Sequence, residues 1–334
     1  MLIGKNNTLY TTYFILRSTV IMVLYDNYGR PLLHLRISVT HRCNYRCIYC
    51  HMEGEDKEIG QELTPTDIYY IAKAAYELGI KKFKITGGEP LVRTDIVDIV
   101  GKLSSLKPLD LAITTNGYYL PDYISDLVKA GLKRINVSLP ALNHEVYKAI
   151  TGVDGLDRVL DGIERAKNAG LHPIKLNFVY LRNINESELW NVLSYARKNK
   201  LILQVIELEP VGIPRELFAK LYRDTKSFEK EISRKAVKVI RRRHMHNRPQ
   251  YFLPDGSIIE IVRSNCNPTF CKHCTRLRLT ADGHLKTCLL RDRPLINVLS
   301  ILRSKDFTSG ERGIIERIKN AIKEINSLRE PYYK

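Results

Sequence analysis

From about residue 33, the hydrophobic positions of the chain alternate between short runs rich in β-branched and aromatic residues and longer amphipathic stretches. The short runs predict strands at residues 35–40, 83–86, 111–115, 135–139, 174–180 and 203–208. Amphipathic stretches such as residues 66–78 and 156–169 predict helices between them, and Thr64 followed by Pro65 is typical of a helix start. Strands that alternate with helices predict an α/β fold with a parallel sheet.

Six strand–helix units are two short of a complete eight-stranded barrel, so an open barrel and a doubly wound sheet both fit. Either fold places the chemistry at the C-terminal ends of the strands. After residue 212 the pattern changes. We expect a basic helix over residues 229–243, a hairpin within 251–262, a second hairpin around 281–283 and a last helix over 310–329.

The chain has 334 residues, enough for one large domain or for a domain with an appendage. We divide it into an N-terminal extension (1–21), the strand–helix units (22–228) and a C-terminal region (229–334). The extension lacks the apolar core and cleavage site of a signal peptide, so we interpret Met22 as the natural start. No apolar run is long enough to span a bilayer.

The net charge of +17 calls for a polyanionic partner: nucleic acid, a membrane surface or a phosphorylated small molecule. The most basic run, residues 241–243, has no alternating aromatic residues that could stack on bases. We therefore interpret it as a solvated face and expect neither a nucleic-acid nor a membrane partner. Trp190 is interpreted as a core residue of a helix.

The seven cysteines form two tight groups, with none between Cys50 and Cys266. A disulfide framework would spread them along the chain, so a reducing cytoplasmic setting fits better. The first group, Cys43, Cys47 and Cys50, directly follows the first predicted strand. Three thiolates so close together suit a metal. Zinc needs a fourth ligand, for which neighbouring histidines are available, whereas a [4Fe–4S] cluster held by three cysteines keeps one iron open.

The second group, Cys271, Cys274 and Cys288, has the spacing C-x2-C-x13-C, with a predicted hairpin inside the long interval. The hairpin would fold Cys288 back beside the first pair. This spacing suits a zinc ribbon and an iron–sulfur site equally. Cys266 could be a fourth ligand, but we interpret it as a small buried hydrophobic residue.

Residues 43–50, with Tyr49 just before the last cysteine, resemble the signature of the radical S-adenosylmethionine superfamily. Residues 87–90 (Gly-Gly-Glu-Pro), 114–117 and 136–139 agree with its further motifs in order and position. The resemblance implies a partial (β/α)6 TIM-like barrel whose first three cysteines hold a [4Fe–4S] cluster. S-adenosylmethionine would bind the open iron and release a 5′-deoxyadenosyl radical after one-electron cleavage. The cofactor-binding residues that it implies are Tyr49, Gly88, Glu89 and Ser138.

Residues 270–278, 281–283 and 288–289 closely resemble the GTP 3′,8-cyclase family of molybdenum cofactor biosynthesis, and the resemblance runs from about residue 24 to 290. It implies that the C-terminal region is an α+β unit that covers the barrel mouth. A second [4Fe–4S] cluster on Cys271, Cys274 and Cys288 would face the guanine of GTP. Hydrogen abstraction at C3′ and attack on C8 would give (8S)-3′,8-cyclo-7,8-dihydroguanosine 5′-triphosphate, the first step towards molybdopterin. The implied partners are GTP, a low-potential electron donor and cyclic pyranopterin monophosphate synthase, which receives the product.

Arg276 and Arg278 are two residues apart, so on a strand they point the same way, and the family resemblance gives them catalytic positions. The resemblance also implies a set of GTP-binding residues: Arg36, Lys84, Thr115, Lys175, Arg276, Leu277 and Arg278. The strand cations among them would be costly on an inner face without a partner, and a polyanion in the barrel would resolve that cost. Outward-facing strand residues are the alternative.

The chain departs from the family pattern at three places. Gln204 stands where the family has an arginine, Pro140 where it has an aspartate, and residues 331–334 replace a terminal pair of glycines. Two other functions stay open: a peptide-modifying radical enzyme with an auxiliary cluster, and a zinc-stabilised nucleic-acid-binding module.

Overall fold

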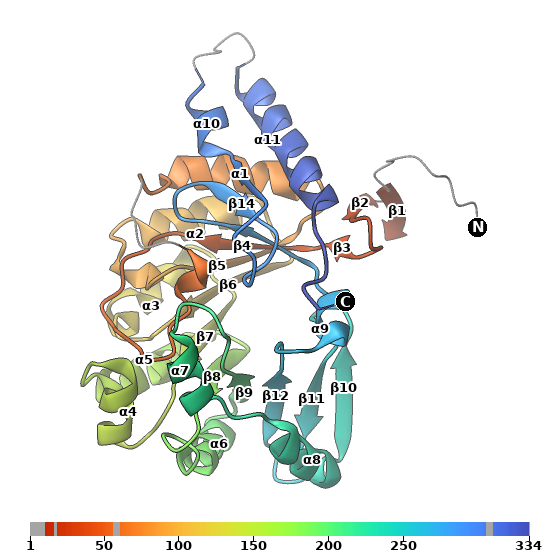
Figure 1. Cartoon of the computed structure of the whole chain (residues 1–334). Helices are drawn as coiled ribbons and strands as arrows, with labels where there is room; N and C mark the ends of the chain where they lie inside the picture. The colour runs from red at the N-terminus through yellow and green to blue at the C-terminus, as the bar shows by residue number, and fades with distance from the viewer. Residues whose placement is uncertain (1–10, 17–18, 56–60, 305–309, 334) are drawn as a thin grey trace.

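In the computed structural model, residues 11–16, 19–55, 61–304 and 310–333 are described (Figure 1). All six predicted strands form, within a residue or two of the expected bounds. They are β4 (His34–Ser38), β5 (Lys82–Thr86), β6 (Asp110–Thr115), β7 (Arg134–Ser138), β8 (Ile174–Tyr180) and β9 (Ile202–Glu207). The helices that follow them are α1 (Pro65–Glu77), α2 (Ile96–Ser105), α3 (Leu120–Lys129), α4 (His144–Thr151), α5 (Leu156–Asn168), α6 (Glu188–Lys198) and α7 (Arg215–Leu221).

The C-terminal part adds one parallel strand to each edge of this six-stranded sheet. β12 (Ile258–Val262) pairs with β9, and β13 (Arg276–Leu279) pairs with β4. The sheet therefore contains eight consecutive parallel strands, in the order β12-β9-β8-β7-β6-β5-β4-β13. Within the described residues no pairing joins β12 to β13, so the barrel stays open, as the partial-barrel prediction requires.

The remaining C-terminal elements are α8 (Lys226–Lys235), β10 (Lys238–Arg242), β11 (Arg248–Phe252), α9 (Pro268–Lys272), β14 (His284–Lys286), β15 (Leu295–Asn297), α10 (Leu299–Leu302) and α11 (Gly310–Ser327). Both predicted hairpins and the last helix are confirmed. The predicted helix over residues 229–243 is wrong in its second half, because the chain leaves α8 and pairs as β10 with β11. The boundary at residue 229 stays a prediction, and both parts share one sheet.

Local sequence explains where the first helix begins. Thr64 and Asp67 form a reciprocal capping box, and Pro65 occupies the first turn. Asp67 also receives two hydrogen bonds of 2.7 Å from Arg303, just after α10. The capping carboxylate therefore joins the start of the barrel to the C-terminal helices, and α11 packs along α1 in Figure 1.

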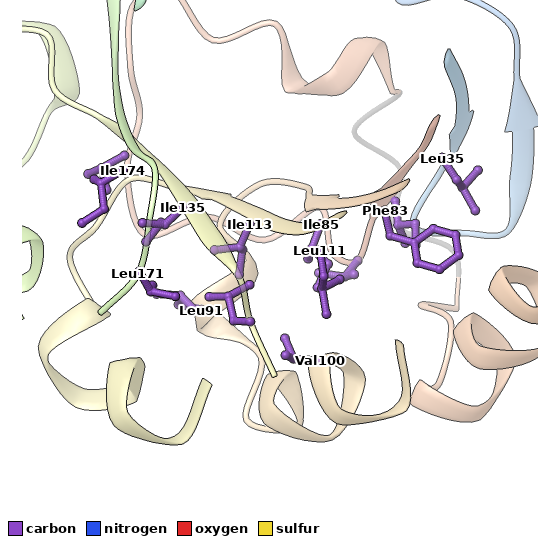
Figure 2. Packing of buried hydrophobic residues seen from close by; sticks show 14 of the residues in the cluster. Leu35, Phe83, Ile85, Leu91, Val100, Leu111, Ile113, Ile135, Leu171 and Ile174 are labelled. Atoms are coloured by element: carbon purple, nitrogen blue, oxygen red, sulfur yellow. The ribbon is translucent and has the colours of Figure 1, made fainter. Parts of the chain in front are cut away.

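The hydrophobic core lies between the sheet and its helices. Leu35, Phe83, Ile85, Ile113 and Ile135 point from the strands towards residues of the surrounding elements (Figure 2). Successive strand residues face opposite sides of a sheet, so the residues between these apolar positions point into the barrel. That alternation places the strand cations on the inner face.

At the N-terminus, β1 (Thr11–Leu16) and β2 (Thr19–Tyr25) form a hairpin, which continues to β3 (Pro31–Leu32). Met22, the expected start, lies within β2; the division at residue 22 stays a prediction. Trp190 is 45% exposed on α6 and packs edge-on against Phe228, so its interpretation as a core residue is wrong. No helix in the described part of the chain combines the length and apolar character that a bilayer crossing needs.

Candidate functional site

The inner face of the sheet encloses a cavity of about 320 Å³. Five of the six proposed cluster cysteines line this cavity. They lie on two segments of the chain: the loop after β4 and the connection from β12 to β13. The sixth, Cys288, follows β14 and also lines the cavity. Two cysteine groups separated by more than 200 residues of sequence therefore meet in one space.

The first cysteine loop rests on the glycines that follow β5. Gly88 N donates to Thr40 O (2.7 Å), and Glu89 N donates to Arg42 O (2.8 Å). A Cβ at Gly88 would lie 2.2 Å from Arg42 O, closer than any real contact, and one at Gly87 would lie 2.5 Å from Thr40 O. Glycine is therefore required at both positions for the cysteine loop to pack against the end of β5.

Glu89 joins the end of β5 to the end of β6. Its carboxylate accepts hydrogen bonds from Thr115 Oγ1 (2.6 Å), Asn116 N (2.6 Å) and Leu91 N (3.0 Å). Burial raises the pKa of Glu89 to about 7, although these hydrogen bonds oppose the shift. Thr115 is thus bound to Glu89, next to the first cysteine group. It is the last residue of β6, whereas the predicted cations Lys84 and Lys175 lie within their strands. Tyr49 and Ser138 also line the cavity.

The first three cysteines have the residue types that could hold a [4Fe–4S] cluster. Among the described residues, no three cysteine, histidine or acidic side chains converge closely enough to hold one metal ion. A [4Fe–4S] cluster instead takes each thiolate on a separate iron. Burial raises the pKa of Cys43 to about 11 and of Cys47 to about 12, so a bound metal would have to supply the charge that stabilises their thiolates. The Nδ1 atom of His51 accepts a hydrogen bond from Glu53 N (3.0 Å).

Two buried arginines hold the second cysteine loop. Arg30 Nη1 donates to Cys271 O (3.0 Å), and Arg329 Nη2 donates to Cys274 O (2.7 Å). Burial would raise the pKa of the Cys274 thiol, but the charge of Arg329, a backbone hydrogen bond from Arg276 and the charge of Arg30 outweigh it and lower the pKa. Cys266 is exposed, so its interpretation as a buried hydrophobic residue is wrong.

The cations of the cavity fall into two classes. In the first, Glu53 bridges two arginines: Arg36 Nη2 and Arg278 Nη1 each donate to it over 2.6 Å, and Thr86 Oγ1 adds a bond of 2.9 Å. Burial would raise the pKa of Glu53, but the two guanidinium groups outweigh it and hold the pKa far below its ordinary value. Arg36 and Arg278, two of the three predicted arginines, therefore have a carboxylate partner in the protein itself.

Lys175 has a partner as well. Its Nζ lies 2.5 Å from Glu260 Oε1. Glu260 also accepts hydrogen bonds from Gln204 (2.9 Å), Gln250 (3.2 Å) and Arg242. Gln204, the departure from the family pattern, thus helps to fix a fully buried carboxylate. The predicted solvated face of residues 241–243 is confirmed for Arg241 and Arg243, while Arg242 turns to Glu260.

The second class has no acidic partner among the described residues: Lys84, Arg248 and Arg276. All three line the cavity. Burial, together with the neighbouring cations Arg134 and Arg36, holds the pKa of Lys84 well below its ordinary value. Leu277, between the two predicted arginines, points the other way into the core and does not line the cavity, so only its backbone could meet a ligand.

Sequence reasoning missed several polar residues in and around this cavity, among them Glu53, Glu260, Arg248 and Arg134. Glu53 and Glu260 gave no signal beyond their residue type, and Arg248 begins β11 three residues before the segment expected to form the first hairpin. Arg134, which lines the cavity and pairs with Asp110 over 2.5 Å, could have been found because it begins β7 beside the other inner-face cations.

The other two departures also lie at the cavity. Pro140 lines it, and its carbonyl accepts a hydrogen bond from Asn185 (2.9 Å). From the C-terminal tail, Glu330 and Tyr332 line it. Arg291 steadies this tail, because it donates to Pro331 O (3.2 Å) and lies 5.4 Å above the Tyr332 ring. The tail therefore reaches the cavity with side chains in place of glycine backbone.

Comparison with known proteins agrees with this arrangement. The profile of the Radical SAM superfamily matches residues 37–196, and that of Molybdenum Cofactor Synthesis C matches residues 201–334. A protein of Metallosphaera sedula named "Probable GTP 3′,8-cyclase" is 46% identical over 92% of this chain and 96% of its own length. One of the same name from Thermococcus kodakarensis is 46% identical over 93% of this chain and its full length. The chain belongs to the GTP 3′,8-cyclase family. Membership in this radical SAM family implies a [4Fe–4S] cluster and S-adenosylmethionine.

Solved structures extend the likeness of this GTP 3′,8-cyclase family member at the level of the fold. Streptococcus suis SuiB bound to S-adenosylmethionine superposes with a TM-score of 0.61 at 17% identity, over 87% of this chain and 68% of that chain. Native anSMEcpe with bound AdoMet gives 0.54 at 16% identity, over 78% of this chain and 75% of that chain. At these identities the likeness concerns the fold alone, and it agrees with the partial barrel.

Proposed function

We propose that this chain is a radical S-adenosylmethionine GTP 3′,8-cyclase that converts GTP to (8S)-3′,8-cyclo-7,8-dihydroguanosine 5′-triphosphate. The observation that carries the proposal is the single cavity that both cysteine groups and a set of buried cations line. One cysteine group suits the cluster and cofactor, the other suits a second cluster, and the cations suit a triphosphate.

We assign the S-adenosylmethionine side of the cavity to Cys43, Cys47, Cys50 and the ends of the next strands. A [4Fe–4S] cluster with S-adenosylmethionine supplies one-electron cleavage to a 5′-deoxyadenosyl radical. The protein would position the cofactor through Tyr49, the Gly88–Glu89 backbone and Ser138, which all line the cavity. Carbonyl and amide groups at the ends of parallel strands suit this role, because ligands of such folds bind there.

We assign the remaining part of the cavity to GTP. Cys271, Cys274 and Cys288 would hold the second [4Fe–4S] cluster, with its open iron towards the guanine. Arg276 and Arg278 would face the reacting nucleotide, and Arg36, Lys84 and Lys175 would complete a positive field for the triphosphate. Guanidinium groups suit phosphate oxygens because they donate two parallel hydrogen bonds. Thr115 would contribute indirectly through Glu89.

The net reaction moves the hydrogen atom of C3′ to 5′-deoxyadenosine and joins C3′ to C8 of guanine. The cofactor cleavage takes one electron, and the cyclised nucleotide takes one further electron and one proton. A low-potential donor must therefore supply two electrons per turnover. Cyclic pyranopterin monophosphate synthase would consume the product. A cytoplasmic setting, expected from the cysteine chemistry, suits such oxygen-sensitive clusters.

The test uses anaerobically reconstituted protein with dithionite, S-adenosylmethionine and each nucleoside triphosphate in turn. The expected result is 5′-deoxyadenosine formed in response to GTP, together with a pterin-like product after oxidation. Cofactor cleavage that is the same with every nucleotide and with none would overturn the cyclase proposal and favour another substrate, with peptides the first to try.

A further inference from the structure

We propose that Arg248 is a further ligand of the substrate's triphosphate, acting with Lys84 and Arg276. The inference rests on the proposed function, and it concerns a residue that neither the sequence motifs nor the family resemblance points to. Arg248 begins β11, outside the six strands of the barrel core, yet its side chain lines the cavity.

The position of Arg248 follows from the register of three strands. Gln250 of β11 lies opposite Glu260 of β12, which lies opposite Gln204 of β9. The side chains of both glutamines donate to Glu260 (2.9 and 3.2 Å), so this face of β11 looks into the barrel. Arg248 is two residues before Gln250 and shares that face. The polar interior thus continues from β9 across β12 to Arg248.

Arg248 is a buried cation that forms no ion pair among the described residues. It is 5% exposed, and its Nε donates a hydrogen bond to Met245 O (3.0 Å). Glu260 attracts it but already has four donors: Lys175, Arg242, Gln204 and Gln250. Within the described residues, the two Nη groups of Arg248 are left free to bind a ligand.

The neighbouring cations Arg276 and Lys84 also form no ion pair among the described residues. Arg248 is the foremost charged group that disfavours the cationic form of Arg276, and Arg276 in turn disfavours that of Lys84. Burial lowers the pKa of Arg248 to about 10. The negative charge of Glu260 opposes this shift, and the positive charge of Arg242 adds to it. Three like charges without acidic partners cost free energy until an anion joins them. An anion with several charges, such as a triphosphate, can serve all three at once.

The other cavity cations do not share this feature. Arg36 and Arg278 share Glu53, Lys175 is held by Glu260, and Arg134 is held by Asp110. These pairs can orient a ligand, but an incoming phosphate must compete with a carboxylate for them. The anion should therefore settle first at the group without acidic partners, which Arg248 completes.

The test compares reconstituted wild-type protein with Arg248→Gln, without reductant so that no turnover occurs. Calorimetric titrations with guanosine, GTP and inorganic tripolyphosphate give three affinities for each protein. We expect Arg248→Gln to weaken GTP and tripolyphosphate binding by about 10- to 100-fold and to leave guanosine binding unchanged. Arg248→Lys, which keeps the charge but loses the planar fork, should lose less. The matched control is Arg241→Gln on the exposed strand β10, which should change no affinity.

Thermal unfolding without nucleotide separates ligand binding from a structural role. Because Glu260 keeps its ion-pair partners Lys175 and Arg242, Arg248→Gln should be about as stable as wild type. Lower stability with equal losses for guanosine and GTP would make Arg248 structural and overturn the inference. If wild type prefers GTP to guanosine and Arg248→Gln keeps that preference, Arg248 alone is excluded. If wild type itself does not prefer GTP, the proposed function fails as well.

Discussion

Glu53 and Arg278 lie 225 residues apart in the chain and are joined by a hydrogen bond of 2.6 Å. Glu53 follows the first cysteine loop by three residues, and Arg278 lies on β13, which leaves the second cysteine loop. The same carboxylate also holds Arg36 of β4. A single buried side chain therefore fixes the two cysteine loops relative to each other.

The first prediction concerns this carboxylate. Glu53→Gln should lower the free energy of unfolding by about 3 kcal/mol, because it leaves two buried guanidinium groups without their counter-charge. Tripolyphosphate should stabilise the variant more than it stabilises wild type, since the anion can replace the lost charge. Chemical denaturation with and without tripolyphosphate measures both effects.

The control for Glu53 is Glu311→Gln, which breaks an exposed ion pair with Lys73 and should cost less than about 1 kcal/mol. Equal stability of Glu53→Gln and wild type would mean that the two arginines do not depend on the carboxylate.

The six barrel strands could be predicted because each is a short apolar run whose inner positions are polar and whose outer positions pack on helices. The helix start at Thr64 could also be predicted, because it depends only on neighbouring residues in the sequence. The two added edge strands were not, because β12 and β13 pair with strands more than 50 residues away and look like ordinary hairpin strands. Alternation within a strand does not reveal which edge of a sheet the strand will join.

The candidate site divides in the same way. Cysteine spacing and strand-end motifs are local patterns, so the sequence pointed to the six cysteines and the motif residues that line the cavity, but not to Glu53, Arg134 or Arg248. Which ion pairs form depends on the tertiary structure. No local pattern in the sequence predicts that Glu53 pairs with Arg278 or that Glu260 pairs with Lys175. For that reason the division of the cations into those with and without a carboxylate emerged only from the structure. The predictions that Trp190 and Cys266 are buried were wrong for a related reason, because residue type alone does not decide exposure.

The second prediction concerns the glycines under the first cysteine loop. Gly88→Ala should prevent normal incorporation of the first cluster, because the added Cβ would displace the Arg42 carbonyl and with it the loop that carries Cys43. Iron content and visible absorbance after anaerobic reconstitution measure the loss. The control is Gly101→Ala in α2, where a Cβ meets nothing within 4 Å. It should retain full iron content and gain up to about 1 kcal/mol in stability. Full iron in Gly88→Ala would show that the loop can shift without cost.

The third prediction concerns the second cluster. Cys271→Ser should reduce iron from about eight to about four atoms per chain and leave the other cluster in place. Elemental analysis for iron, zinc and acid-labile sulfide provides the measurement. Cys266→Ser is the matched control, because Cys266 is exposed and precedes Cys271 by five residues. Equal iron loss in both variants would make Cys266 a ligand, and zinc in place of iron would exclude the second cluster.

The last prediction concerns the pH dependence that Glu260 gives to the fold. Burial would raise its pKa, but Lys175, Arg248 and Arg242 outweigh burial and hold the pKa at about 2, below the ordinary value of 4.5. A carboxylate with a depressed folded-state pKa stabilises the fold above its unfolded-state pKa, and that contribution disappears as the pH falls through the folded-state pKa.

Glu260→Gln should therefore be less stable than wild type by about 3 kcal/mol at neutral pH, since it leaves Lys175 and Arg242 without their counter-charge. The difference should stay constant down to about pH 4.5 and shrink towards about pH 2, because wild type then loses the same charge by protonation. Urea denaturation of both proteins across this range gives the curve. The surface variant Glu231→Gln, which breaks an exposed pair with Lys235, should track wild type throughout. A difference that does not change with pH would show that Glu260 acts through its shape and hydrogen bonds, and not through its charge.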